Sequence, residues 1–257
     1  MKSLKILRDI WLIFQRNMLL MLRSPLWVIL GVSQPVVYLL LFAPLLKPAL
    51  APMGAHSQAD AYRIYVPGML VALALAGGLY VGFDLLRELA GGIIERARVT
   101  PVSRLALLLG RSLRDVVVLV IQAAIIVVLS LLFGLTVAIP NLLIGYGLLA
   151  MITLTSASFS YGIALTVKNP AVLGQLINNV AQPVMLLSGT LLPIALAPLW
   201  LRDAANGNPF NWAVTGMRAL FTGHPDDPAI WKAAVMLAAL AVITIAWSGR
   251  KFARSVR

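Results

Sequence analysis

A run of twenty residues without an ionisable side chain, Val116–Leu135, constrains the fold of this chain more than any other feature. At a rise of 1.5 Å per residue, about 20 apolar residues form a helix long enough to cross the roughly 30 Å hydrocarbon layer of a bilayer. Because lipid offers no hydrogen bonds to a polypeptide backbone, such a run must be helical. We therefore expect an integral membrane protein.

The composition agrees with a surface that faces lipid. Hydrophobic residues make up 60% of the chain and charged residues only 12%, whereas soluble domains carry about 25% charged residues. A net charge of +12 would suggest nucleic acid in a soluble protein, but loops rich in Lys and Arg are typical of the cytoplasmic side of membrane proteins. The lack of cysteine excludes disulfides, thiolate chemistry and cysteine-based metal sites.

Hydropathy predicts an all-α integral membrane protein with a single transmembrane domain over residues 1–257 and no internal repeat. Lys and Arg placement sets its orientation: with six spans, 16 of the 21 basic residues fall on the side that holds both termini. That side is therefore expected to be the cytoplasm. The predicted spans are residues 26–46, 64–86, 116–135, 141–167, 171–189 and 229–248.

Residues 1–24 lack the clean apolar segment of a signal peptide. Apolar residues such as Leu4, Trp11 and Phe14 recur at helical spacing, and charged residues fall elsewhere on the same helix. This pattern predicts an interfacial helix with its aromatic side chains toward the membrane. A solvated helix packed on a partner is the alternative.

Residues 190–222 are apolar but interrupted. Pro193 and Pro198 break a helix in the first part, Asn206–Pro209 forms a turn, and Trp212–Phe221 is a second helical stretch. We expect an outer re-entrant hairpin of two short helices that enters the outer leaflet and returns.

Residues 87–115 form the longest predicted cytoplasmic connection. Gly91 and Gly92 can end the helix that leaves the second span, and Thr100–Pro101 ends the short amphipathic stretch that follows. Such a helix suits docking on a cytoplasmic partner, although basic side chains that snorkel to the headgroups would give the same pattern.

Polar side chains within the predicted spans are costly in lipid and often functional. A substrate path along spans one and five is one explanation for them, and hydrogen bonding between helices is the other. For the Ser and Thr cluster at residues 153–160 we favour contacts between helices over a substrate path. For Gly78-x-x-x-Gly82 we expect close helix packing. The candidate path residues are Gln34, Asn178, Asn179, Gln182 and Ser188.

Several chemistries have no sequence support. No predicted span carries a charge at its centre, as an ion-coupled transporter would need. The chain contains no phosphate-binding G-x-x-x-x-G-K-[ST] loop and no recognisable catalytic pair or metal motif. We expect no catalytic residue, metal or cofactor in this chain.

Two runs resemble a known family. The run GGIIERARVTPVSRLALLLGR, residues 91–111, is similar to the cytoplasmic loop of ABC-2 type permeases. The run LLSGTLLPIALAPLWLRDAANGNPFNWAVTGMRAL, residues 186–220, is similar to their outer segment. Within the family the chain most resembles the daunorubicin-resistance-like permeases, although polysaccharide and lipo-oligosaccharide exporters share both motifs.

The resemblance implies a permease subunit of an ABC exporter in the plasma membrane, which moves an amphipathic drug or lipid-like molecule outward. Two permeases, identical or not, would pair, and separate ATPase subunits would hold ATP and Mg²⁺. The alternatives are a polysaccharide exporter permease, an ATP-independent carrier and an intramembrane enzyme.

The resemblance also assigns the ATPase contacts. Residues 93–104 would be a coupling helix seated in the ATPase, and the interfacial helix would supply a second contact. The coupling residues would be Glu95, Arg96, Arg98, Thr100, Pro101 and Arg104, and the contacts on the interfacial helix Lys5, Arg8, Asp9 and Arg16.

Overall fold

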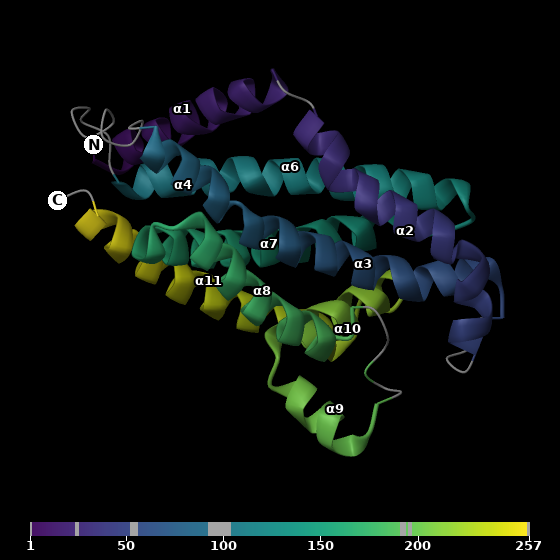
Figure 1. Cartoon of the computed structure of the whole chain (residues 1–257). Coiled ribbons are helices and arrows are strands. Elements are labelled where there is room, and N and C mark those ends of the chain that lie inside the picture. The colour runs from purple at the N-terminus through teal and green to yellow at the C-terminus, as the bar shows by residue number, and fades with distance from the viewer. Residues whose placement is uncertain are drawn as a thin grey trace.

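The computed structural model describes residues 2–23, 26–51, 56–91, 104–190, 194 and 197–255. All regular elements within these ranges are helices, which run mostly alongside one another (Figure 1). In chain order they are α1 (Lys2–Leu22), α2 (Leu26–Leu50), α3 (Gln58–Tyr80), α4 (Gly82–Ala90), α6 (Arg104–Leu132), α7 (Ile139–Val167), α8 (Pro170–Leu187), α9 (Leu199–Asn206), α10 (Pro209–Phe221) and α11 (Pro228–Ser255).

Helix α7 forms the centre of the bundle and packs against α3, α6, α10 and α11. Its inward side chains include Leu149, Ile152 and Tyr161, which are almost completely buried. A long helix that is buried around much of its circumference needs apolar or small residues on several faces. The sequence of α7 meets this need because Ser, Thr, Ala and Gly alternate with larger apolar residues.

Small residues bring α3 and α4 close to α7. A Cβ atom added to Gly78 would overlap Ser156, and one added to Gly82 would overlap Ser160. The Ser156 hydroxyl donates to the Ile152 carbonyl of its own helix. The predicted packing roles of Gly78-x-x-x-Gly82 and of the Ser and Thr cluster are therefore confirmed.

Four stretches within the described ranges are long and apolar enough to cross a membrane. They cover the predicted spans 64–86, 141–167 and 229–248 and all but the last three residues of the predicted span 116–135. Helices α2 and α8 occupy the positions of the other two predicted spans, so a count of six remains a prediction. The four stretches are Gln58–Ala90, Ala106–Leu132, Ile139–Val167 and Pro228–Phe252.

Several helix boundaries differ from the sequence prediction. The second predicted span is not one continuous helix, because α3 ends at Tyr80 and α4 begins at Gly82. Helix α6 extends the third predicted span toward its N-terminus, as far as Arg104, and ends at Leu132, three residues before the predicted end of that span. Its first three turns carry the charged residues that the hydropathy pattern had left in a loop.

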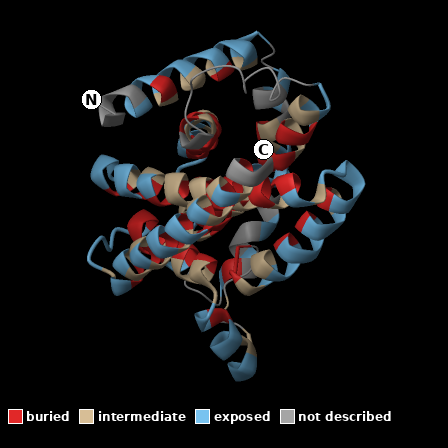
Figure 2. Ribbon diagram, turned by 90° about the vertical axis from the view of Figure 1, so that its left-hand side faces the viewer, coloured by how far each residue is buried: buried red, intermediate tan, exposed pale blue. Residues whose placement is uncertain are grey.

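The predicted interfacial helix is α1, which packs against α6. A Cβ atom on Gly110 of α6 would lie 2.8 Å from the Ile13 Cβ atom of α1, so the helices cross at this glycine. Figure 2 shows α1 largely exposed on the side away from the bundle. Leu7 and Trp11 are 65% and 53% exposed, which suits a helix that lies on lipid.

The predicted outer segment contains two short helices, but they differ from the expected ones. The first is α9, which begins at Leu199 after Pro198, and the second, α10, begins at Pro209 rather than at Trp212. The Asn208 side chain caps α10 by accepting a hydrogen bond from the Phe210 N–H at 3.0 Å. Helix α9 projects from the bundle, whereas α1 begins and α11 ends at the end of the bundle that holds α4 and the start of α6 (Figure 1).

Candidate functional site

The candidate site lies where α4 and α6 flank the segment 92–103. This segment holds nearly all of the predicted coupling helix 93–104 and is outside the described residues, together with Glu95, Arg96, Arg98, Thr100 and Pro101. Arg104 begins α6, but its side chain is likewise not described. Helices α4 and α6 are the two stems that carry this segment. The structure describes α4 to its last residue, Ala90, and the side chains of α6 from Ala106 onward.

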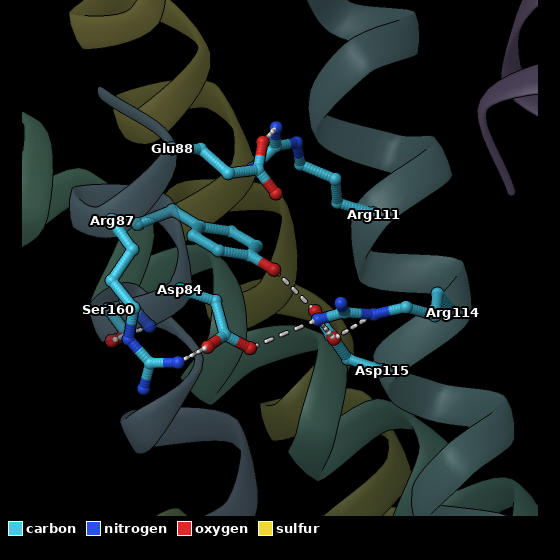
Figure 3. A network of polar contacts seen from close by, with 9 residues as sticks. Asp84, Arg87, Glu88, Arg111, Arg114, Asp115 and Ser160 are labelled. Carbon is cyan, nitrogen blue, oxygen red and sulfur yellow. Dashed lines mark hydrogen bonds and ion pairs between the residues drawn. The ribbon is translucent and has the colours of Figure 1, made fainter. Parts of the chain in front are cut away.

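An ion-pair network ties these stems together (Figure 3). Glu88 of α4 pairs with Arg111 of α6, and their side chains are 26% and 9% exposed. On α6, Arg114 Nε donates to Asp115 Oδ1 at 2.9 Å. The Tyr161 hydroxyl of α7 donates to Asp115 Oδ2. The network therefore joins three helices close to the segment 92–103.

Asp84 belongs to the same network but is held less tightly. Its carboxylate oxygens lie 3.4 Å from Arg87 Nη1 and 3.7 Å from Arg114 Nη2. Both distances exceed the 2.7–2.9 Å of a strong charge-assisted hydrogen bond, and the Asp84 side chain is 44% exposed. Asp84 is therefore both paired with Arg87 and partly open to solvent.

The joint between α3 and α4 has an identifiable cause. Gly82 N–H donates to Ser160 Oγ at 3.1 Å, and the Ser160 hydroxyl donates in turn to the Leu79 carbonyl. A side chain inserted in this way replaces part of the regular hydrogen-bond ladder, which is a known cause of helix kinks. Ser160 of α7 therefore sets the direction in which α4 leaves the membrane-length helix (Figure 3).

A cavity of about 640 Å³ lies beside the network and extends along α3 and α6. Ion-pair residues line one end of it, and Leu73, Ala76, Gln34 and Gln122 line the other. Several lining residues are exposed, among them Leu20 at 53% and Tyr80 at 50%, so the cavity communicates with the outside of the chain. Its volume lies within the range of small-molecule sites.

The residues predicted on α1 separate into two groups. Arg8 and Arg16 are exposed, whereas Asp9 is buried and does not share their accessible position. The reason is helical spacing, because Asp9 lies one turn before Ile13, which contacts α6 at Gly110. The Lys5 side chain is outside the described part of α1.

The residues predicted to line a substrate path also differ in their exposure. Asn178, Asn179 and Gln182 lie exposed on α8, and Gln34 lies exposed on α2. Ser188 is buried, and its hydroxyl donates to the carbonyl three residues earlier at 2.7 Å, so it does not join that exposed polar surface. Gln34 is the member of this set that lines the cavity, and Asn178 accepts a hydrogen bond from the cavity residue Tyr80 at 3.2 Å.

A second polar contact organises the opposite end of the bundle. Arg218 of α10 donates from Nε to the Ile64 carbonyl of α3 at 3.0 Å and from Nη2 to the Gly189 carbonyl after α8 at 2.7 Å. Burial lowers the pKa of Arg218 to about 10, so the guanidinium keeps its charge at neutral pH. This side chain ties the outer segment to α3 and to the turn that follows α8.

Sequence reasoning missed the network residues Glu88, Arg111, Arg114 and Asp115. Hydropathy excluded these residues from the spans because they are charged. The spacing of the charged residues along α6, however, contained a helical signal. Arg114 and Asp115 lie three and four residues after Arg111, which places the three side chains on one helix face. The opposite charges of these residues and of Glu88 could have indicated ion pairs between the helices on either side of segment 92–103.

Comparison with known proteins gives a consistent result. The sequence profile described as "ABC-2 type transporter" matches residues 8–222. A protein of Porphyra purpurea named "Putative transport permease ycf38" is 26% identical over 223 residues, which cover 86% of this chain and 76% of the relative. The daunorubicin resistance ABC transporter permease protein DrrB1 of Streptomyces coeruleorubidus is 26% identical over 210 residues, which cover 81% of this chain and 73% of the relative.

Proposed function

This chain belongs to the ABC-2 type transporter family and is a membrane permease, and we propose that it is one of two membrane subunits of an exporter. Separate ATPase subunits supply the energy, and the cargo is an amphipathic drug or lipid-like molecule. The observation that carries the proposal is the family match over residues 8–222, which includes both stems of segment 92–103. The relative named for daunorubicin resistance supports the class of cargo.

In this proposal the segment 92–103 is the contact with the ATPase. The pairing of Glu88 with Arg111 supports this role because it holds the two stems of the segment together. A displacement of the segment is then carried by α4 and α6 as a unit, and the joint at Gly82 is the place where α4 can change direction. Such coupling works only if the ATPase binds the two membrane arrangements with different affinity.

The exposed amide side chains on α8 support a path for cargo next to a second permease. Asn178, Asn179 and Gln182 present polar groups on α8, at the position of a predicted span, without burial inside this chain, and such an arrangement would be costly against lipid. A paired subunit would cover them. We further propose that both termini lie in the cytoplasm, since basic residues concentrate at that end of the bundle.

Co-purification tests the proposal. The tagged chain is expressed with its neighbouring genes, extracted in mild detergent and analysed for an attached ATP-hydrolysing polypeptide. We expect such a subunit at a stoichiometry of one per permease and an ATPase activity that depends on the permease. Purification of a stable chain without any ATPase, and transport by the chain alone in liposomes, would overturn it.

A further inference from the structure

The cavity beside the ion-pair network has the shape of an amphiphile site. It is bounded by residues of α1, α2, α3, α4 and α6. Its lining runs from Glu88 back to Leu73 along α4 and α3, a length of roughly 20 Å at the helical rise of 1.5 Å per residue. One end is charged, and the deeper end combines apolar side chains with the amides of Gln34 and Gln122.

The charged end carries the carboxylates of Asp84, Glu88 and Asp115 and the guanidiniums of Arg87 and Arg114. Among these carboxylates, Asp84 has the longest ion-pair distances. Asp115 accepts hydrogen bonds from Arg114 and Tyr161, and Glu88 is paired with Arg111. The carboxylate of Asp84, in contrast, has neighbours only at 3.4 Å and 3.7 Å among the described residues and remains 44% exposed. A ligand ammonium or phosphonium group would therefore compete with weak ion pairs rather than with strong ones.

Two aromatic rings line the same cavity as this carboxylate. Tyr80 and Phe83 both line the cavity, and their rings stack with centroids 6.1 Å apart. Aromatic faces attract organic cations through the ring quadrupole, and the attraction is larger where water is excluded. A cavity lined by a carboxylate and two rings is thus suited to a lipophilic cation rather than to a strongly hydrated metal ion.

We propose that this cavity binds a lipophilic organic cation, with the charge at Asp84 beside Tyr80 and Phe83 and the apolar body against Leu73 and Ala76. The proposal rests on the exporter function and names the chemical class of its cargo. It places the cargo within one subunit, in the half of the bundle that holds the stems of segment 92–103.

Tetraphenylphosphonium and tetraphenylborate form a matched pair of probes, because they share shape and size and differ in charge. Binding of each is measured on the full-length protein in lipid nanodiscs, with empty nanodiscs as the blank. Asp84→Asn removes the carboxylate, and Ala76→Phe fills the deep end without touching the ion pairs. Asp203→Asn, on exposed α9 outside the cavity, is the matched control for loss of one charge.

We expect the cation to bind at least about tenfold more tightly than the anion, and Asp84→Asn to weaken cation binding by about tenfold or more. Asp203→Asn should bind as the unaltered protein does. Ala76→Phe should lose cation binding while keeping its melting temperature. Equal affinities for the two probes, or unchanged cation binding in Asp84→Asn, would overturn the assignment.

Should Asp84→Asn fail to fold, Ala76→Phe decides: retained cation binding in that variant overturns the proposal, and its loss supports it. The outcome is separable from that of the exporter function, which is measured by co-purification of an ATPase. A chain that brings down an ATPase but does not bind tetraphenylphosphonium would refute the cavity assignment alone.

Discussion

Replacement of Glu88 by Gln should destabilise the bundle because it leaves Arg111 charged and nearly buried. The Arg111 side chain is 9% exposed and that of Glu88 is 26% exposed. Removal of one partner from a fully buried pair costs about 3–5 kcal/mol, and water that reaches the half-open side recovers part of this loss. We therefore expect a loss of about 2–3 kcal/mol in the free energy of unfolding.

The double variant Glu88→Gln/Arg111→Met should be less damaging than the two single changes predict together. Methionine keeps an apolar stem of similar length and removes the uncompensated charge. Residues in direct contact give interaction energies of about 0.5–3 kcal/mol in double-mutant cycles. A coupling energy of about 1–2 kcal/mol is expected here, since both side chains are mostly shielded from solvent.

Unfolding in mixed dodecylmaltoside and dodecyl sulfate micelles, followed by tryptophan fluorescence, measures these energies. Arg87→Gln is the control, because Arg87 pairs with Asp84 on the exposed surface, where its side chain is 63% accessible. That change should cost less than about 1 kcal/mol. A coupling energy for Glu88 and Arg111 no larger than that control would refute the argument that this pair holds the stems together.

Three further predictions address other parts of the chain. Alanine at both Glu95 and Arg98 should leave membrane insertion intact and abolish recovery of the ATPase in a pull-down, and unchanged recovery would contradict the coupling role. Gly78→Val should lower the melting temperature because the added side chain would overlap Ser156, and we expect a loss of about 2 kcal/mol in the free energy of unfolding. An unaltered melting curve would contradict this prediction, because it would show that α3 and α7 can move apart without loss of stability. Arg218→Lys should loosen the outer segment, because a lysine cannot reproduce the fork that donates to two carbonyls at once, and faster hydrogen exchange of that segment, measured by mass spectrometry, is the readout.

The long apolar elements were predictable because a bilayer restricts the choice of structure. Runs such as Val116–Leu135 permit only a helix of membrane length. The glycines at positions 78 and 82 were also interpretable, since small residues four apart imply close approach. The change of direction at Asn206–Pro209 separates α9 from α10 as expected, because Asn, Gly and Pro have strong local preferences, although α10 begins at Pro209, three residues earlier than predicted.

The ion-pair network was not predictable from hydropathy, because its stability depends on partners that are distant in sequence. The Tyr161 hydroxyl reaches Asp115 from α7 across 46 positions of the chain. The break at Gly82 depends similarly on Ser160 of another helix. A scale that scores each residue alone counts Arg111 as a cost to burial, whereas Glu88 compensates that cost in the folded chain.

The cavity and the network share residues, and this has a thermodynamic consequence. Asp84 and Glu88 line the cavity and lie on α4, which leads directly into segment 92–103. A ligand that binds one position of α4 more tightly than another biases the position of that segment. By linkage, an ATPase bound to the segment must change the affinity of the cavity for its ligand by the same factor by which the ligand changes ATPase binding. Tetraphenylphosphonium should therefore bind the permease with different affinity in the presence and absence of the nucleotide-free ATPase, and equal affinities would show that the cavity and the stems are energetically independent.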